Sequence, residues 1–336
     1  MNHTIDVLSA ENLLETGSVP AAFILCLIPA AVIFFSRRFR GSTFLRRAAA
    51  VLCSVSALFL CAGYLPAAQA QDTCTWNDVN TWSGLYEAMQ SDGCIKLTAS
   101  VTYGTGGGEH ASETLVLSGK TVTLDLNGNT IDRGLAWEAA QEGGYVISVS
   151  GTLTLTGSGT ITGGKNAGNG GGVYVASKGS LTMNSGISIE YNSAENGGGV
   201  YVDGGTFTLS GGTFTGNSAS SNGGGVYVYS GSFYLSGGTI SDNGVTSDNS
   251  HGGGVYVYDT GTYFYLSGNP TISGNRKNGS ASNLYLEGGK AITITGPLTN
   301  ATPIGVGKDG SGFLLPKVFP AMERTPTSKV IIQIIP

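Results

Sequence analysis

Regularly spaced tyrosines are the residues of this chain best suited to contact a ligand. Five of them stand in Val-Tyr-Val or Leu-Tyr-Leu tripeptides 26 to 29 residues apart: Tyr174, Tyr201, Tyr227, Tyr256 and Tyr285. Tyr234 and Tyr265 recur in a second short run. A tyrosine ring joins an apolar face to a hydroxyl at low entropic cost, so an outward row of them would suit sugar rings. In the alternative interpretation, the stacked rings only stabilise a sheet, by about 0.2–1 kcal/mol per cross-strand pair.

Acidic and basic side chains give a weaker indication of catalysis. Hydrolysis of a glycosidic bond needs two positioned carboxylates, and the densest acidic patch holds Asp242, Asp248 and His251. Arg276 and Lys277 occupy the matching turn one repeat later. No acid recurs at the same strand position in adjacent repeats, where stacking would pair two of them. We therefore expect a non-enzymatic protein, with Asp242, Asp248, Arg276 and Lys277 as weak catalytic candidates.

Cofactor and metal motifs are missing from the sequence. The Asn-Gly-Gly-Gly turns precede neither a Lys-Ser/Thr pair nor a helix, so they do not resemble phosphate loops. No CxxC motif or Cys/His cluster is present, which disfavours structural zinc. The recurring asparagines are interpreted as structural, because stacked Asn side chains bond along solenoid turns: Asn192, Asn217, Asn243 and Asn275. The sequence thus predicts no cofactor and no metal.

An internal repeat positions the tyrosines. Each unit of 26 to 29 residues holds three short alternating runs separated by Gly, Ser, Asn and Asp, such as 200–202, 207–209 and 213–217. Such runs predict three short strands and three turns. Equivalent positions match best between repeats, so each strand should stack on its own copy about 4.8 Å away. The sequence therefore predicts an all-β fold, a right-handed parallel β-helix with three short strands per coil.

Three interior ladders follow from this arrangement. The residues expected to stack inward are Val173, Val200, Val226 and Val255; Leu209, Leu235 and Leu266; and Ile189, Phe214, Ile240 and Ile272. With valines inward, a period of two directs the tyrosines between them outward.

Less regular segments flank the repeats. An amphipathic helix is expected over 75–93, with Trp82, Leu85, Tyr86 and Met89 on one face. It would cap the solenoid in the region 71–93, since an open end exposes apolar rungs and a sheet edge. The first coil would begin at 94–101, and the β-helix would span 94–296. Four prolines interrupt 297–336, which is expected to be an irregular cap or a truncated tail.

The Gly-Gly-x-Val-Tyr-Val and Phe214-Thr215-Gly216-Asn217 elements resemble the GG[AIV] and FxxN repeats of the chlamydial polymorphic membrane proteins. Similar repeats occur in bacterial surface proteins with a right-handed, pectate-lyase-like β-helix. The resemblance covers about residues 94–296, although three of the four third strands carry Ile in place of Phe. It implies an exported adhesin-like solenoid, or, if the chain were an enzyme, a polysaccharide lyase or glycoside hydrolase.

The first seventy residues indicate export. Five arginines lie between residues 37 and 47, an apolar run covers 48–65, and Ala68-Gln69-Ala70 follows. This order is typical of a secretory signal peptide over 37–70, cleaved after Ala70. Residues 1–36 contain another apolar run at 19–35. This run is either an extra membrane segment or, if the true start of the protein lies near Arg37, not part of the protein. Any membrane contact would involve 19–35 or 48–65.

Two cysteines remain beyond the targeting segments, Cys74 and Cys94. In an exported chain they could close a loop of about 20 residues, stabilising it by roughly 3 kcal/mol on the chain-entropy model. Two free thiols are the alternative.

Composition narrows the function classes. The chain has 336 residues, 54 of them Gly, with 17 Lys+Arg against 22 Asp+Glu, so nucleic-acid binding is disfavoured. We expect a secreted or cell-surface bacterial protein, a monomer, that binds polysaccharide or host glycans through its tyrosines. A structural spacer or gene fragment without a ligand is the remaining alternative.

Overall fold

The computed structural model describes residues 74–136, 138–258, 261–288, 290–299, 303–308, 311–315 and 330–333. Internal contacts divide the chain into Met1–Thr73 and Cys74–Pro336, and every described residue belongs to the second unit. The expected signal peptide with Ala70, and the apolar runs 19–35 and 48–65, therefore lie outside the described residues.

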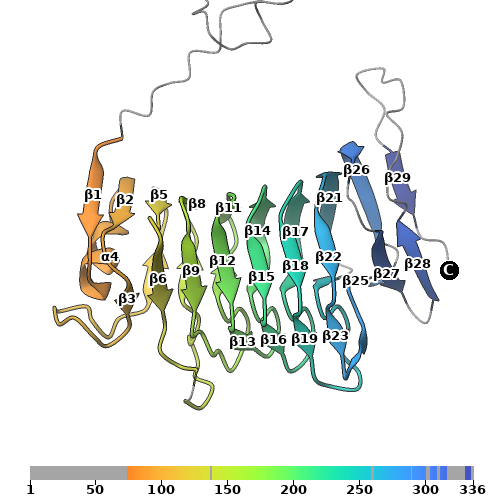
Figure 1. Ribbon diagram of the computed structural model, residues 1–336, viewed down its shortest axis with the longest axis horizontal. Coiled ribbons are helices and arrows are strands. Elements are labelled where there is room, and N and C mark those ends of the chain that lie inside the picture. Colours follow the sequence, from red (N-terminus) through yellow and green to blue (C-terminus); the bar gives the residue numbers. More distant parts are fainter. Residues whose placement is uncertain are drawn as a thin grey trace, which may run out of the picture. The chain divides into compact units, whose positions relative to one another are not determined.

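The second unit is a right-handed parallel β-helix whose coils follow one another from β1 to the C-terminal strands (Figure 1). Its strands form three columns. The first holds β4 (Leu115–Leu117), β7 (Ile147–Val149), β10 (Val173–Val175), β20 (Val255–Val257), β25 (Leu284–Leu286) and β27 (Ile304–Lys308). The second holds β1 (Trp76–Val79), β2 (Gly93–Leu97), β5 (Thr121–Asp125), β8 (Thr152–Thr156), β11 (Ser180–Met183), β21 (Thr262–Gly268) and β26 (Ala291–Leu298).

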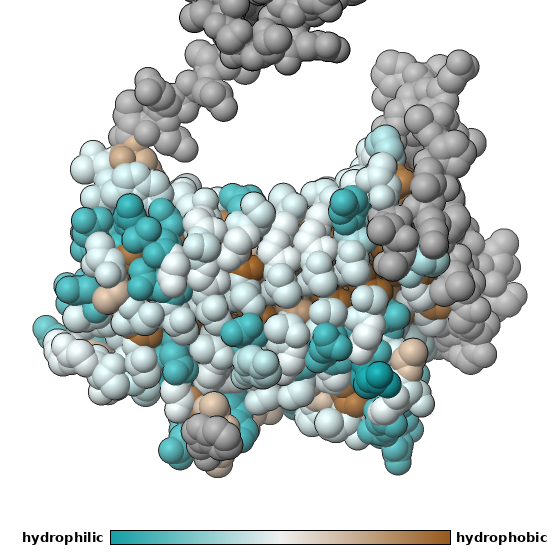
Figure 2. Space-filling view, viewed as in Figure 1, coloured by the Kyte–Doolittle hydropathy of each residue, from teal (hydrophilic) through white to brown (hydrophobic). Residues whose placement is uncertain are grey.

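The third column is a separate sheet of seven described strands, one per coil. They are β3 (Val101–Thr102), β6 (Asn129–Asp132), β9 (Gly159–Thr162), β12 (Ile187–Glu190), β15 (Thr213–Thr215), β18 (Thr239–Ser241) and β22 (Thr271–Ser273). Small outward residues flank a buried apolar residue on these strands, as Thr213 and Thr215 flank Phe214. The middle of the coloured face in Figure 2 is accordingly mostly near neutral in hydropathy, with apolar residues in small patches, whereas hydrophilic residues gather at the left end and along the lower edge.

Two features of the coils differ from the expected three separate strands. In two coils the first and second strands merge into the ten-residue strands β14 (Val200–Leu209) and β17 (Val226–Leu235), which pair with a register shift around Asp203. A small sheet also follows the third column: β13 (Ser193–Ala194), β16 (Ser218–Ala219), β19 (Gly244–Val245), β23 (Arg276–Lys277) and β24 (Ser280–Ala281).

The three predicted interior ladders are confirmed. Val173, Val200, Val226 and Val255 are successive register partners with no exposed surface. Leu209, Leu235 and Leu266 pair in the same way, as do Ile189, Phe214, Ile240 and Ile272, and all are at most 1% exposed. Each coil buries its apolar residues against copies above and below, so the apolar core runs continuously through the coils.

Asparagines form a fourth interior ladder. Asn192, Asn217, Asn243 and Asn275 are each 1% exposed. The Nδ2 of each donates to the Oδ1 of the next at 2.9–3.1 Å, and the last of these acceptors is Asn283. Each Nδ2 also donates to a backbone carbonyl, such as Ile189 O at 2.8 Å from Asn217. The amides therefore satisfy buried backbone groups at a turn, which agrees with the structural interpretation.

The N-terminal end carries a capping helix that is shorter than the sequence indicated. Helix α4 spans only Trp82–Ala88, and Trp82, Leu85 and Met89 join the core. Thr81 caps it by accepting a hydrogen bond from Gly84 N at 3.0 Å. The preceding residues form strand β1, which pairs with β2, so the β-structure begins before residue 94. This strand is mostly polar, so no apolar alternation in the sequence predicts it.

The C-terminal strands depart from the parallel pattern. β27 still pairs in parallel with β25. It then forms an antiparallel hairpin with β28 (Ser311–Leu315), while β29 (Val330–Gln333) pairs antiparallel with β26. These strands lie within 297–336, where prolines indicated an irregular cap or a truncated tail.

Candidate functional site

The five repeat tyrosines form one column of stacked rings, which Tyr145 extends at one end. We call this set the tyrosine column: Tyr145, Tyr174, Tyr201, Tyr227, Tyr256 and Tyr285. Successive ring centroids lie 4.9–6.1 Å apart, and the angle between ring planes is at most 36°. His251 stacks on Tyr285 at 4.1 Å. The parallel register of the first-column strands creates the stack, because it places each tyrosine directly over the next.

The column points away from the apolar core, as the period of two predicts, yet its middle is buried. Tyr201, Tyr227 and Tyr256 are only 5%, 6% and 4% exposed, and they form a cluster separate from the core. A glycine turn also approaches the base of each of these three side chains. A Cβ at Gly223, which has φ 63°, would lie 2.7 Å from the Tyr227 Cβ. The ring faces are therefore occupied by neighbouring tyrosines and are not available to a sugar.

Two carboxylates bind hydroxyls of the column. Tyr174 donates to Asp203 at 2.7 Å, and Tyr256 donates to Glu287. Burial, followed by the hydrogen bond and charge of Asp203, raises the pKa of Tyr174. Burial and then Glu287 raise the pKa of Tyr256 in the same way. Burial is also the main cause that raises the pKa of Tyr201 and of Tyr227. These phenols remain neutral, and none is prepared to act as a base.

A second set of tyrosines lies on the outer surface of the neighbouring coils. We call these the outer tyrosines: Tyr229, Tyr234, Tyr258, Tyr263 and Tyr265. Tyr229, Tyr234 and Tyr263 are 42%, 40% and 60% exposed. Tyr258 and Tyr265 are half-buried beneath partners: Tyr229 stacks on Tyr258 at 5.1 Å and Tyr234 on Tyr265 at 4.4 Å. They follow one another along β17, along β21 and just after β20.

The sequence interpretation named only Tyr234 and Tyr265 from this outer set. Tyr229 and Tyr258 could have been found from the Val-Tyr-Val-Tyr run that occurs in two adjacent repeats, since both tyrosines in such a run point to the same side. Tyr263 stands two residues before Tyr265 and belongs to the same alternation. The accessible aromatic surface is therefore formed by the outer tyrosines, which lie beside the tyrosine column, and not by the regularly spaced tyrosines of the repeat.

The weak catalytic candidates lie at the surface and bond to other groups. Asp242 and Asp248 are exposed, and Asp248 accepts from Asn278 Nδ2 at 2.7 Å. Arg276 is exposed and donates to the carbonyl of Gly279 at 2.7 Å, while Lys277 is half-buried. Of these four, Asp242 alone has a positive φ, 57°. The hydrogen bonds of Asp248 and Arg276 thus join each of them to residues of the turn at Asn278 and Gly279. They do not join the two side chains to each other.

Asp203 and Glu287 accept from hydroxyls of the tyrosine column, but their positions do not suit glycoside hydrolysis. They belong to coils three apart, and stacked strands about 4.8 Å apart separate such coils by about 14 Å. Paired catalytic carboxylates lie about 5–9.5 Å apart. Each acid instead holds a phenol of an adjacent coil.

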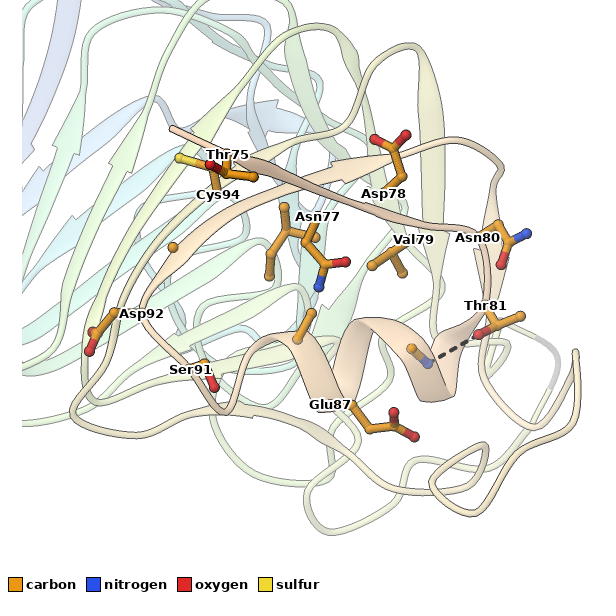
Figure 3. A pocket seen from close by; sticks show the side chains of 14 residues that line it. Thr75, Asn77, Asp78, Val79, Asn80, Thr81, Glu87, Ser91, Asp92 and Cys94 are labelled. Atoms are coloured by element: carbon orange, nitrogen blue, oxygen red, sulfur yellow. Dashed lines mark hydrogen bonds between the residues drawn. The ribbon is translucent and has the colours of Figure 1, made fainter. Parts of the chain in front are cut away.

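A pocket of about 430 Å³ lies at the N-terminal end, lined by residues of β1, α4 and β2. Asn77 lies between β1 and the helix, whereas the carboxylates of Asp78 and Glu87 point in opposite directions (Figure 3). Asp92 accepts from Thr121 N at 2.6 Å. The pocket thus collects polar side chains without aiming them at one point. The structure also pairs Cys74 with Cys94 at its rim, with Cα atoms 5.8 Å apart.

A buried cation supports the N-terminal end of the tyrosine column. Arg133 is 4% exposed and lies 3.5 Å from the centroid of the Tyr103 ring. Its Nε donates to the carbonyl of Tyr145 at 3.2 Å, and its Nη1 has no hydrogen-bond partner. No repeat or motif indicates a role for Arg133, because it follows strand β6 in a loop that does not recur in the other coils.

In the described part of the chain, no group of three or more His, Cys, Asp or Glu side chains could hold a metal ion. Within the same residues, no helix has the length and apolar character needed to cross a membrane.

The chain matches no protein-family model, no curated protein and no solved structure. The resemblance to the chlamydial polymorphic membrane proteins therefore rests on the repeat motifs, and what the structure adds is the parallel β-helix itself.

Proposed function

We propose that this chain is an exported, adhesin-like β-helix protein that binds polysaccharide or host-surface glycans through its outer tyrosines. The observation that carries the proposal is the exposure of Tyr229, Tyr234 and Tyr263 on adjacent coils. Tyrosine provides an apolar ring face for a sugar and a hydroxyl for hydrogen bonding. A row of such rings suits an extended polymer better than a single small molecule.

The rigid base beneath these rings supports the proposal. Residues flanking the outer tyrosines are buried, such as Phe233 and Leu235 on either side of Tyr234. Parallel pairing of β17 with β21 fixes the backbones that carry Tyr234, Tyr263 and Tyr265. Side chains held in this way lose little conformational freedom on binding. The tyrosine column has a different role here, since it forms the packed layer beside which the outer rings lie.

Export is supported by the sequence and by the cysteine pair. The basic segment, apolar run and Ala68-Gln69-Ala70 are typical of a cleaved signal peptide. A disulfide between Cys74 and Cys94 suits an oxidising compartment outside the cytosol. We therefore place the protein at the bacterial cell surface or in the medium.

A glycan array and a set of soluble polysaccharides, probed with the full chain, test the proposal. The variant Tyr229→Ala/Tyr263→Ala removes two exposed rings, and Tyr191→Ala is a matched control, since Tyr191 is 66% exposed and lies outside the outer set. We expect the double variant to bind at least tenfold more weakly, a change of about 1.4 kcal/mol. The control should bind like the unchanged chain.

A parallel assay for new reducing ends and unsaturated uronates separates binding from catalysis. Product that disappears on changing Asp242 or Arg276 would replace the proposal with a lyase or hydrolase. Absence of binding across the glycans and of any product would instead favour a structural spacer. Binding that survives the double variant would show that the outer tyrosines are not the site.

A further inference from the structure

The outer pair Tyr234 and Tyr265 has the shortest ring separation of any tyrosine pair within the described residues. The centroids lie 4.4 Å apart and the planes differ by 11°. The two residues are register partners on the parallel strands β17 and β21. They are 31 positions apart in the sequence, so a bond between them would join two successive coils.

The surrounding structure holds the two rings together. Phe233 and Phe264, the residues preceding them, are buried and stack at 5.4 Å. Leu235 and Leu266, which follow them, are also buried register partners. Each tyrosine is thus anchored on both sides, while the Tyr234 ring remains 40% exposed to reagents in solution.

We propose that Tyr234 and Tyr265 are an oxidative cross-linking site at which a dityrosine bond joins the two coils. The oxidant is hydrogen peroxide used by a haem peroxidase. Each phenol loses one electron and one proton to become a phenoxyl radical. The radicals join through ring carbons ortho to their oxygens, and transfer of the two ring hydrogens to the oxygens restores both phenols. Two tyrosines and one peroxide give one dityrosine and two waters.

Geometry directs the reaction to this pair. Coupling needs a second radical within reach before the first is quenched, and Tyr234 has its partner directly against its ring. Tyr229 and Tyr258 form a second outer pair, but their rings are 5.1 Å apart and tilted by 22°. Tyr191 is more exposed than either pair, yet it makes no aromatic contact within the described part of the chain. It should therefore be oxidised without forming an intramolecular bond.

The test treats the dilute full chain with a haem peroxidase and hydrogen peroxide. Dityrosine fluorescence, molecular size and a peptide map by mass spectrometry are then measured. We expect a monomer that yields one linked peptide pair containing Tyr234 and Tyr265, lighter by two hydrogen atoms than the separate peptides. Its unfolding temperature should rise, because the bond restricts the unfolded chain.

Two conservative variants make the outcome decisive. Tyr265→Phe keeps a ring in the stack but has no phenol to oxidise, so the linked pair should disappear while the fold persists. Tyr191→Phe should leave the linked pair unchanged. A map without the Tyr234–Tyr265 link, or with Tyr234 linked only between molecules, would overturn the proposal. These results do not depend on glycan binding, so either proposal can fail alone.

Discussion

The tyrosine column and the outer tyrosines use one residue type in two opposite ways. Both sets project from the same side of their strands, away from the apolar core. In the column, glycine turns and neighbouring rings reduce Tyr201, Tyr227 and Tyr256 to 4–6% exposure. A few residues further along the chain, Tyr229 and Tyr263 are 42% and 60% exposed. An outward direction therefore does not by itself make a side chain accessible.

The two sets of tyrosines have different roles. Column tyrosines lie in an ordered stack, and burial raises the pKa of Tyr201, Tyr227 and Tyr256, so these residues stabilise the coils and stay neutral. Outer tyrosines bury less surface and present their rings to solvent, so they can change without unfolding the protein. Ligand binding is a property that we assign to the second set alone.

Of the tests proposed, alkaline titration should have the largest effect on the tyrosine column, because it should unfold the protein. Free tyrosine ionises near pH 10. Because burial raises the pKa of Tyr174, Tyr201, Tyr227 and Tyr256, their contribution to stability is present below about pH 10 and is lost as pH rises through their folded pKa values. We expect a late step of tyrosinate absorbance, above the pH at which free tyrosine ionises, that coincides with the loss of circular dichroism. A single step near pH 10 with the fold retained would remove the distinction.

Truncating the column should cost much of the stability of the coils. Tyr227→Ala removes a buried ring between Tyr201 and Tyr256, and such changes typically cost about 3–5 kcal/mol. The measurement is chemical denaturation followed by circular dichroism. Tyr227→Phe is the control, since it keeps the stack and should lose far less. Equal stability of the alanine and unchanged chains would show that the column is not a packed layer.

The asparagine ladder offers a polar counterpart to the column. Asn217→Ala removes the Oδ1 that accepts from the backbone N–H of Asn192, and a buried group left unpaired costs about 1–3 kcal/mol. Denaturation should reveal this loss, which we expect to be smaller than that of Tyr227→Ala. Asn269→Ala is a surface control, because Asn269 is exposed and does not have the positive φ that disfavours alanine. The interpretation would be wrong if both variants were as stable as the unchanged chain.

Truncating an outer tyrosine should have the smallest effect on folding. Tyr234→Ala removes a ring that is 40% exposed, so we expect a loss below about 1.5 kcal/mol. Denaturation beside Tyr227→Ala measures the difference directly. If Tyr234→Ala lowered the free energy of unfolding as much as Tyr227→Ala does, the outer tyrosines would contribute to stability in the same way as the column.

The repeat made the fold predictable because every coil places equivalent residues at equivalent positions. Val200, Leu209 and Phe214 could be assigned to the interior from alternation alone, and the ladders through them are present. The first strand was missed because Asn77 and Asp78 give it no apolar alternation. The predicted helix was too long because it included the residues of this polar strand, whereas the apolar face of the helix begins only at Trp82.

The site was less predictable because accessibility depends on neighbours in three dimensions. Alternation gave the direction of Tyr201 and Tyr227 but not the glycine turns that approach their Cβ atoms. Nor did it indicate that Asp203 and Glu287 reach across to hydroxyls of adjacent coils. Tyr229 and Tyr258 were overlooked because only two repeats carry them.

Residue-resolved nitration of the folded chain by tetranitromethane tests the separation of the two sets most directly. The reagent needs an accessible phenolate, and Tyr201, Tyr227 and Tyr256 are both buried and raised in pKa. Peptide mapping after brief treatment near neutral pH should find nitrotyrosine at Tyr229, Tyr234 and Tyr263, and unmodified Tyr201, Tyr227 and Tyr256. Comparable nitration of Tyr201, Tyr227 and Tyr256 in the folded protein would contradict the account.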